Sequence, residues 1–442
     1  MFTPWTLLID VGIISLLLLL GKLLRSKVRI IQRFFIPPSL LAGLFGLVLG
    51  PEVLGWLPLS GNMGTYAGIL IALVFSCIPF TSERGTSSGG SRIGRMWAYS
   101  QAGMLLQWAL GGALGLWVLS LVWPVNPAMG LSMPAGFCGG HGTAAAIGES
   151  FASYGVEEMQ SLAMTSATVG IIASVVIGMW LISWGAAHGK TKYICAFENL
   201  SPELRTGILP PDKRKSMGMA SFSAISLDSM TFNFAIIAMV ALGGYGLAKL
   251  IALAWPALML PVFSCAFIVG ILFKWVLSKV KVDEHISKPI LGHLSGAFTD
   301  YLVAFGVASI RLEIVGRYVV PLVVLLVIGL VLTLLYVFWI GARIHKTDSF
   351  EKSIFTWGWF TGTMAMGIAL LRITDPDSKS GCLDDYAMAY LYIAPVEIAL
   401  VSLSPLAFGS GLGWLFVGVC ALVGVAILGF SVARGWLTVN RQ

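Results

Sequence analysis

The stretch PAGFCGGHGTAAAIGE, from Pro134 to Glu149, interrupts a chain that is otherwise strongly apolar. It holds five glycines together with His141 and Thr143. An apolar transmembrane helix satisfies its own backbone hydrogen bonds, whereas glycine disfavours helix and permits unusual dihedral angles. We therefore predict that the helix breaks near Gly139 and that the segment folds as a re-entrant hairpin, in which two short helices enter and leave on one side.

The composition of the whole chain is that of a polytopic integral membrane protein. Of its 442 residues, 57% are hydrophobic and 11% are charged, and the mean hydropathy is +0.87. Soluble domains carry about 25% charged residues. The net charge of +7 comes mostly from Lys and Arg in a few loops, which is typical of orientation signals rather than of nucleic-acid binding. We expect an all-α fold without a nucleic-acid partner.

Eleven apolar segments approach the length of about 20 residues that crosses a bilayer. We predict spans at Trp5–Leu24, Ile36–Gly50, Thr65–Phe80, Met96–Val122, Leu162–Ala187, Phe232–Ala254, Leu260–Leu277, Ile290–Ile310, Tyr318–Gly341, Tyr386–Phe408 and Leu412–Arg434. Because Lys and Arg in short loops stay in the cytoplasm, the basic residues after the first span, such as Lys22 and Lys27, predict an outside N-terminus. The same rule predicts a C-terminus inside the cell. Asp10 is expected to be hydrated near a span end.

Features of the first half of the chain return in the second half. Pro38 opens the second predicted span and Pro261 the seventh, and the pattern Gly-Thr-x-Ala begins at both Gly142 and Gly362. Five spans precede a hydrophilic linker, so the second half starts on the opposite side of the membrane. Inverted repeats of this kind are typical of secondary transporters, whose sites lie near the bilayer midplane.

The repeats divide the chain into four predicted parts. Residues 1–187 form the first five-helix repeat with its hairpin at about 130–153, and residues 188–226 form a cytoplasmic linker. Residues 227–410 form the second repeat with its hairpin at about 353–375, and residues 411–442 add one C-terminal span.

The second hairpin is predicted from TWGWFTGTMAMGIALLRITDP, residues 356–376, which combines glycines with hydroxyls. At the two turns, amides and helix N-termini favour an anion such as a carboxylate, whereas freed carbonyls and hydroxyls suit sodium. The predicted substrate-binding residues are Gly139, Gly140, His141, Gly142, Thr143, Thr361, Gly362, Thr363 and Arg372. Arg372 is included because a guanidinium can bind a carboxylate through two hydrogen bonds.

Ionisable residues inside membrane spans are costly and mark transport pathways. Asp300 and Glu397 lie near the middle of predicted spans, so they join Thr143 and Thr363 as predicted ion-coupling residues. Three roles fit His141: contact with the substrate, titration with pH, or packing within the hairpin. The sequence predicts sodium as the metal ion and no transition-metal site, because the histidines lack partners at ligand spacing. It indicates no other cofactor.

The stretch CGGHGTAAAI resembles the first hairpin of bacterial members of the glutamate:sodium symporter family. The shared positions are Gly139, Gly140, His141, Gly142, Thr143, Ala145 and Ala146. IPPSLLAGL, which begins at Ile36, is more loosely similar, and the likeness covers most of the chain in span order. The second hairpin departs from the family, because Thr361–Ala365 has no proline, and the C-terminal span is additional.

The resemblance implies a sodium-coupled uptake system for glutamate or a related dicarboxylate in the bacterial inner membrane. It also implies a homodimer and an elevator-like motion of a hairpin-bearing core. The residues leave open a proton-coupled transporter of another organic anion, with Asp300, Glu397 or His141 as the proton carrier. An anion channel and a membrane receptor fit less well. No catalytic constellation is present, so an enzyme is not expected.

Overall fold

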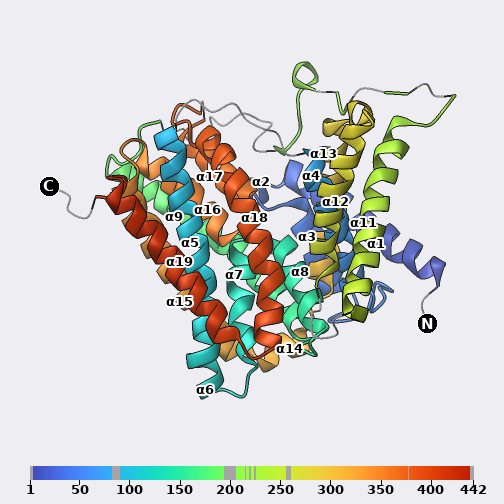
Figure 1. The fold of residues 1–442 in the computed structure, drawn as a ribbon, viewed down its shortest axis with the longest axis horizontal. Coiled ribbons are helices and arrows are strands. Elements are labelled where there is room, and N and C mark those ends of the chain that lie inside the picture. Colours follow the sequence, from blue (N-terminus) through green and yellow to red (C-terminus); the bar gives the residue numbers. More distant parts are fainter. Residues whose placement is uncertain are drawn as a thin grey trace. The chain divides into compact units, whose positions relative to one another are not determined.

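The structure is a computed structural model that describes residues 3–81, 90–193, 206–214, 216–218, 221–222, 225–254, 260–376 and 378–438. The secondary structure in these ranges consists of helices, without strands, so the fold is all-α as predicted (Figure 1). The predicted linker at 188–226 therefore lies partly outside the described residues. Ten helices in the described ranges are long and apolar enough to cross a membrane.

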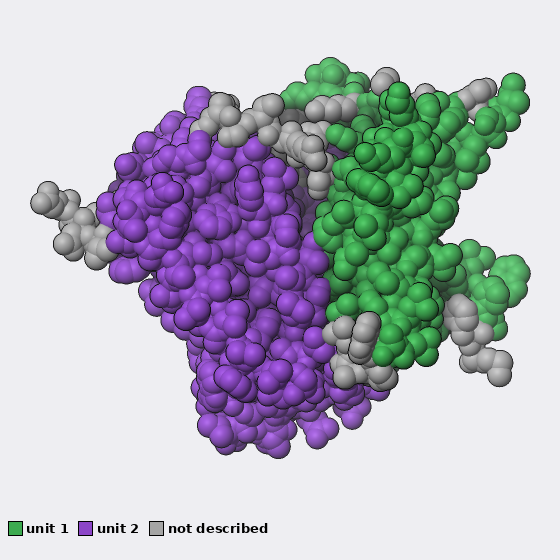
Figure 2. Space-filling view, viewed as in Figure 1, with its two compact units in different colours: residues 1–21, 38–84, 209–309 green, residues 22–37, 85–208, 310–442 purple. Residues whose placement is uncertain are grey.

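The chain separates into two compact units, and each unit takes helices from both halves of the sequence (Figure 2). Unit 1 comprises residues 1–21, 38–84 and 209–309, and unit 2 comprises residues 22–37, 85–208 and 310–442. The compact units therefore do not coincide with the sequential halves predicted as repeats. This division arises from contacts between helices that are distant in sequence. A local sequence pattern does not predict such contacts.

Six main helices make up the described part of unit 1. They are α1 (Pro4–Lys27, of which residues up to 21 belong here), α3 (Pro38–Leu49), α4 (Met63–Thr81), α11 (Ser229–Ala254), α12 (Val262–Lys279) and α13 (Lys288–Ala308). Two short 3-10 turns, η4 (Pro211–Lys213) and η5 (Asp283–His285), accompany them.

The predicted second span is shorter in the structure than the sequence suggested. Helix α3 has 12 residues and begins at Pro38, where the missing N–H of proline costs no hydrogen bond. It ends before Gly50, which Pro51 follows. At 1.5 Å per residue such a helix covers only about 18 Å of the roughly 30 Å hydrocarbon core. Helix α3 is not among the ten described helices that are long enough to cross a membrane, so the prediction of a span at Ile36–Gly50 was wrong.

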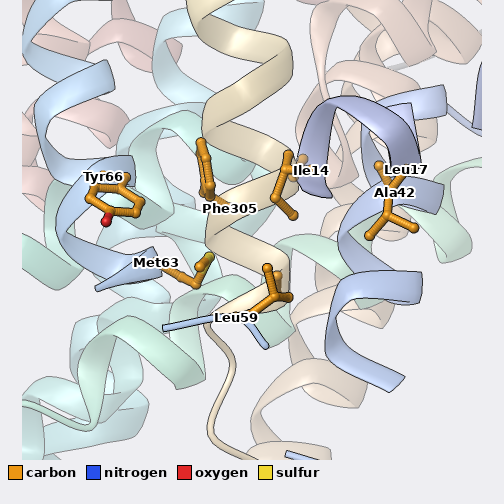
Figure 3. Packing of buried hydrophobic residues seen from close by; sticks show 9 residues of the cluster. Ile14, Leu17, Ala42, Leu59, Met63, Tyr66 and Phe305 are labelled. Atoms are coloured by element: carbon orange, nitrogen blue, oxygen red, sulfur yellow. The ribbon is translucent and has the colours of Figure 1, made fainter. Parts of the chain in front are cut away.

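A core in unit 1 joins α1, α3, α4 and α13. Ile14, Leu17, Ala42, Met63 and Phe305 are buried together there (Figure 3). Tyr66 packs edge-on against Phe305, with ring centroids 5.2 Å apart. Such interdigitated apolar side chains fix the helices of this unit against one another.

Asp10 lies at this core with no exposed surface, so the expectation that it is hydrated was wrong. Its Oδ1 accepts a hydrogen bond from the Ser60 N–H at 2.9 Å, and its Oδ2 accepts from the Ser60 and Tyr66 hydroxyls. A buried carboxylate is tolerated when donors surround it. Three donors satisfy Asp10, so its role in unit 1 is structural.

Unit 2 contains the remaining helices and both interrupted segments. Its long helices are α5 (Gly90–Leu114, continued by η1, Gly115–Leu119, and α6, Ser120–Val122), α9 (Met159–Ala187), α15 (Val319–Ile344), α18 (Cys382–Gly409) and α19 (Gly413–Ala433). Its short elements are α2 (Arg29–Arg33), η2 (Pro127–Leu131), α7 (Ser132–Phe137), α8 (Gly140–Ala152), α14 (Leu312–Arg317), α16 (Ser349–Thr361) and α17 (Met364–Thr374). Both glycine-rich stretches singled out in the sequence therefore belong to one compact unit.

Candidate functional site

Two pairs of short helices in unit 2 are interrupted at the predicted glycines. Helix α7 ends at Phe137 and α8 begins at Gly140, whereas α16 ends at Thr361 and α17 begins at Met364. A Cβ added to Gly358 would lie 2.6 Å from the Cα of Gly367, so α16 and α17 fold back on each other. Thr363 caps α17, because its hydroxyl accepts the Met366 N–H at 3.4 Å.

The two breaks lie in direct contact. Gly140 has a φ of +62°, in the left-handed region that favours glycine. A Cβ at this position would lie 2.7 Å from Cγ2 of Thr363 and 2.9 Å from the carbonyl oxygen of Gly362. Both the backbone angle and the lack of space therefore require glycine where the two segments meet.

The second interrupted segment, α16 and α17, packs against small residues of α9. The hydroxyl of Ser174 donates to the Gly358 carbonyl at 3.3 Å, and the Trp357 indole N–H donates to the Ser174 carbonyl at 3.0 Å. Gly170 lies against both the Thr361 carbonyl and the Phe137 ring, so α9 packs between the two interrupted segments. Small residues let helices approach closely inside a membrane protein.

Gln107 on α5 holds the second break from another side. Its amide Nε2 donates to the Thr333 hydroxyl and to the Phe360 carbonyl, both at 3.0 Å. Phe360 is the residue before Thr361, so this contact binds a carbonyl beside the point where α16 ends.

His141 is buried, with 1% of its surface exposed, and its two ring nitrogens differ in their surroundings. Its Nε2 lies 3.1 Å from the Thr168 hydroxyl, which already donates its proton to the Met164 carbonyl at 2.9 Å. We therefore assign the ring proton to Nε2, which donates to Thr168. Nδ1 is left as a buried acceptor that has no hydrogen-bond partner among the described residues.

Buried polar side-chain atoms without a partner are concentrated in unit 2. Within the described part of the chain, every such atom belongs to this unit: those of Gln101, Gln107, His141, Glu149, Gln160, Arg343, His345, Tyr386 and Ser404. Leaving a buried polar group unpaired costs about 1–3 kcal/mol, and such groups often mark a place where something else binds. Unit 2 is therefore the better candidate for the functional unit.

The meeting point of the breaks can bind charged solutes of both signs. The N–H groups that begin α8 and α17 precede the first turn of helical hydrogen bonds, although Thr363 caps Met366, and the positive ends of the two helix dipoles favour an anion. Carbonyls at Thr361 and Gly362, together with the hydroxyls of Thr143 and Thr363, are oxygen ligands for a hard cation. In the described residues, no group of three or more His, Cys, Asp or Glu side chains could hold a metal ion.

The predicted site residues do not all come together. Gly139, Gly140, His141, Gly142 and Thr143 lie at or just after the first break, and Thr361, Gly362 and Thr363 at the second. Arg372 lies near the other end of α17, where it donates to the Pro376 carbonyl at 2.8 Å. Glu397 lies on α18 of unit 2, whereas Asp300 is an exposed residue on α13 of unit 1.

A buried ion pair, with a half-exposed arginine beside it, fixes the beginning of α16 to α18. Lys352, with 3% of its surface exposed, donates to Oδ2 of Asp385 at 2.9 Å. The guanidinium of Arg92, from α5, lies 3.1 Å from the same oxygen. Two cations on one carboxylate satisfy charges that would otherwise be costly to bury.

Near the start of α16, the surroundings shift the pKa values of two further side chains. Burial lowers the pKa of His345 well below its ordinary value, with the nearby charges of Lys352 and Arg95 acting in the same direction. His345 is therefore neutral at physiological pH. The hydrogen bond and charge of Asp348, whose Oδ1 lies 3.0 Å from the Lys192 ammonium, raise the pKa of Lys192. These contacts attach the chain that follows α9 to the start of α16.

Sequence reasoning missed several polar residues that hold or adjoin the breaks. Gln107 and Thr168 are uncharged, so a search for ionisable groups within spans passes over them. Tyr386 and Tyr390 were treated as apolar span residues, although they are four residues apart on the helix that carries Glu397. That spacing, one helical turn, was the available signal.

Comparison with protein-family models places the chain in a known family. A family model described as sodium/glutamate symporter matches residues 6–366, which include all of the first interrupted segment and the second break. The matched region ends before α18 and α19. No curated protein gave a significant match.

We predict that Gly140→Ala destabilises the protein. A non-glycine residue held in the left-handed region costs about 1–3 kcal/mol, and the added methyl group has no room beside Thr363. Thermal unfolding of the purified protein should start at a lower temperature. Gly418→Ala on α19, where a Cβ meets nothing within 4 Å, is the control and should not lower it. A higher unfolding temperature for Gly140→Ala would mean that the helix runs unbroken through this position.

We predict that Asp385→Leu is strongly destabilising and that adding Lys352→Met reverses most of the effect. Removing one partner leaves a buried charge uncompensated, at a cost of about 3–5 kcal/mol, whereas replacing a buried pair by apolar residues is often neutral. The thermal midpoints of the wild type, the single variant and the double variant measure the difference. Equal midpoints for the wild type and Asp385→Leu would show that the ion pair does not stabilise this region, and equal midpoints for the single and double variants would show that unpaired Lys352 does not cause the loss.

Proposed function

Because this chain belongs to the sodium/glutamate symporter family, we propose that it is a secondary transporter that carries glutamate, or a related anionic amino acid or dicarboxylate, into the cell together with sodium. The family and the ten apolar helices identify a multi-pass membrane transporter rather than an enzyme. The contact between the two breaks is the observation that supports the proposed site.

The substrate carboxylate binds at the N-termini of α8 and α17 in this proposal. The two helices have 13 and 11 residues, and their first turns begin at Gly140 and Met364, on either side of the contact. Their free N–H groups and dipoles attract negative charge. Arg372 was a predicted partner of the carboxylate, but its contact with Pro376 favours a role in ending α17 instead.

Sodium binds oxygen atoms at the same contact. Candidate ligands are the hydroxyls of Thr143 and Thr363 and the carbonyls left free by the break at Gly362. The side chain of Thr143 lies over Gly139, directly beside the first break. A cation and an anion bound side by side stabilise each other, so each raises the affinity for the other, as symport requires. Asp300 and Glu397 stay predicted partners of a cation.

Transport follows an elevator-like alternating-access motion in which unit 2 carries the site and unit 1 is the scaffold. Two observations support this division: both breaks belong to unit 2, and each unit forms its own contacts. Each unit also combines helices from both halves of the chain, as interleaved inverted repeats would. The chain is proposed to lie in a bacterial inner membrane as a homodimer, with the N-terminus outside and the two breaks in re-entrant hairpins.

The direct test is uptake into proteoliposomes containing the purified full-length protein. Labelled L-glutamate should accumulate when sodium is higher outside, because the ion gradient drives symport, and collapse of the gradient should abolish accumulation. Empty liposomes are the control. Accumulation that ignores sodium but follows a pH gradient would make protons the coupling ion, with His141, Asp300 or Glu397 as carriers. Flux without saturation or counterflow would indicate a channel.

The role of Thr363 can be separated from the fold by a pair of variants. Thr363→Val removes the hydroxyl, so we expect uptake to need a higher sodium concentration, whereas Thr363→Ser keeps the hydroxyl and should behave like the wild type. The measurement is the sodium concentration at half-maximal uptake. An unchanged value for the valine variant would exclude this hydroxyl as a sodium ligand.

A further inference from the structure

Three side chains on one face of α18 form a polar group that the family match does not include. Tyr386, Tyr390 and Glu397 are at positions i, i+4 and i+11 of this helix, which 3.6 residues per turn place on the same face. The Tyr390 hydroxyl donates to Oε2 of Glu397 at 3.1 Å. The rings of Tyr386 and Tyr390 stack, with centroids 5.6 Å apart.

Tyr386 is 2% exposed, and its hydroxyl has no hydrogen-bond partner among the described residues. Two rings of α16 pack edge-on against it, Phe355 at 4.8 Å and Trp359 at 5.0 Å between centroids. Glu397 and Tyr390 are partly buried, and the carboxylate of Glu397 accepts a hydrogen bond from the Tyr390 hydroxyl. A buried hydroxyl without a partner, next to a carboxylate, is a place where a ligand can supply the missing hydrogen bonds.

This group adjoins the first break. Helix α18, which carries this group, packs against α8, and Gly409 at the end of α18 lies against the ring of Tyr154, two residues beyond the end of α8. Glu397 precedes Gly409 by about as many residues as Gly140 precedes Tyr154, which puts Glu397 near the level of the first turn of α8. A solute held at the N-terminus of α8 therefore lies near a carboxylate as well as near helix amides. The two features recognise opposite charges, amides the anionic end of a molecule and Glu397 a cationic end.

The surroundings of Glu397 favour an organic ammonium group over sodium. Sodium prefers several hard oxygen ligands, but the Phe355 and Trp359 rings against Tyr386 supply none, so the side-chain oxygens of this group are those of Glu397 and the two tyrosine hydroxyls. An alkylammonium forms charge-assisted hydrogen bonds with a carboxylate and is also attracted to the faces of aromatic rings. The Tyr390 hydroxyl donates its hydrogen bond to Glu397. This bond fixes the position of the carboxylate, which can then accept hydrogen bonds from the ligand.

We propose that Glu397, Tyr390 and Tyr386 bind the α-ammonium group of the substrate, which makes the protein selective for anionic amino acids over dicarboxylates that lack an amino group. This inference rests on the proposed transport function and narrows its substrate class. The sequence analysis predicted that Glu397 interacts with a cation, and this proposal names that cation as the ammonium group of the substrate.

The test compares L-glutamate with glutarate, which has the same carbon chain and both carboxylates but no ammonium group. Binding to the purified full-length protein is measured by titration calorimetry at saturating sodium. The wild type should bind L-glutamate about 10- to 100-fold more tightly than glutarate, the range expected for hydrogen bonds to a charged group. Glu397→Gln should weaken L-glutamate binding until the two affinities are about equal, and should leave glutarate nearly unchanged.

Further variants protect the test against misfolding. Tyr390→Phe removes only the hydroxyl that holds Glu397 and should lower the preference for L-glutamate in part. Tyr392→Phe, at a 65% exposed position of the same helix, should have no effect. A preference that persists in Glu397→Gln, or an equal loss of both ligands in a variant that elutes as a single folded species, would overturn the assignment. Failure of the wild type to bind L-glutamate at all would instead contradict the proposed transport function.

Discussion

The contact between Gly140 and the Gly362–Thr363 break is the constraint on which unit 2 depends. At this point two chain segments more than two hundred residues apart in sequence approach so closely that a single methyl group does not fit. The approach also leaves the ends of α8 and α17 without helical hydrogen-bond partners. Inside an apolar protein such ends are tolerated only where protein, water or a solute satisfies them. The close approach therefore leaves unpaired helix ends, and a bound solute can supply the hydrogen bonds that they lack.

The remainder of unit 2 holds this contact in place from several directions. Helix α9 receives the second segment through Gly170 and Ser174, and Gln107 binds the carbonyl of Phe360 beside the break. At the start of α16, the buried pair of Lys352 and Asp385 fixes the segment to α18. These are hydrogen bonds and ion pairs within a strongly apolar chain, where an unpaired partner is expensive. They restrict the second segment to one position, as a selective site requires.

The two units differ in whether their buried polar groups have hydrogen-bond partners. In unit 1, Asp10 receives hydrogen bonds from Ser60 and Tyr66, and Asn233 pairs with the Ser229 carbonyl and the Ser287 N–H. In unit 2, His141 and Tyr386 keep buried atoms without partners among the described residues. Satisfied groups stabilise a rigid body, whereas unsatisfied groups near a break gain free energy when a ligand supplies the missing bond. This contrast agrees with a scaffold and a carrier.

The sequence by itself determined the all-helical membrane class, most of the spans and the position of both breaks, because apolar length and glycine placement act locally. It also carried the family resemblance, through the motif around His141. Only the tertiary structure decided that α3 is a short helix, that Asp10 is buried, that Arg372 lies away from the contact, and that Asp300 is an exposed residue of unit 1. It likewise packed α18, which carries Tyr386 and Glu397, against α8. These features depend on which helices pack together across hundreds of residues, and periodicity along one segment contains no information about its partner.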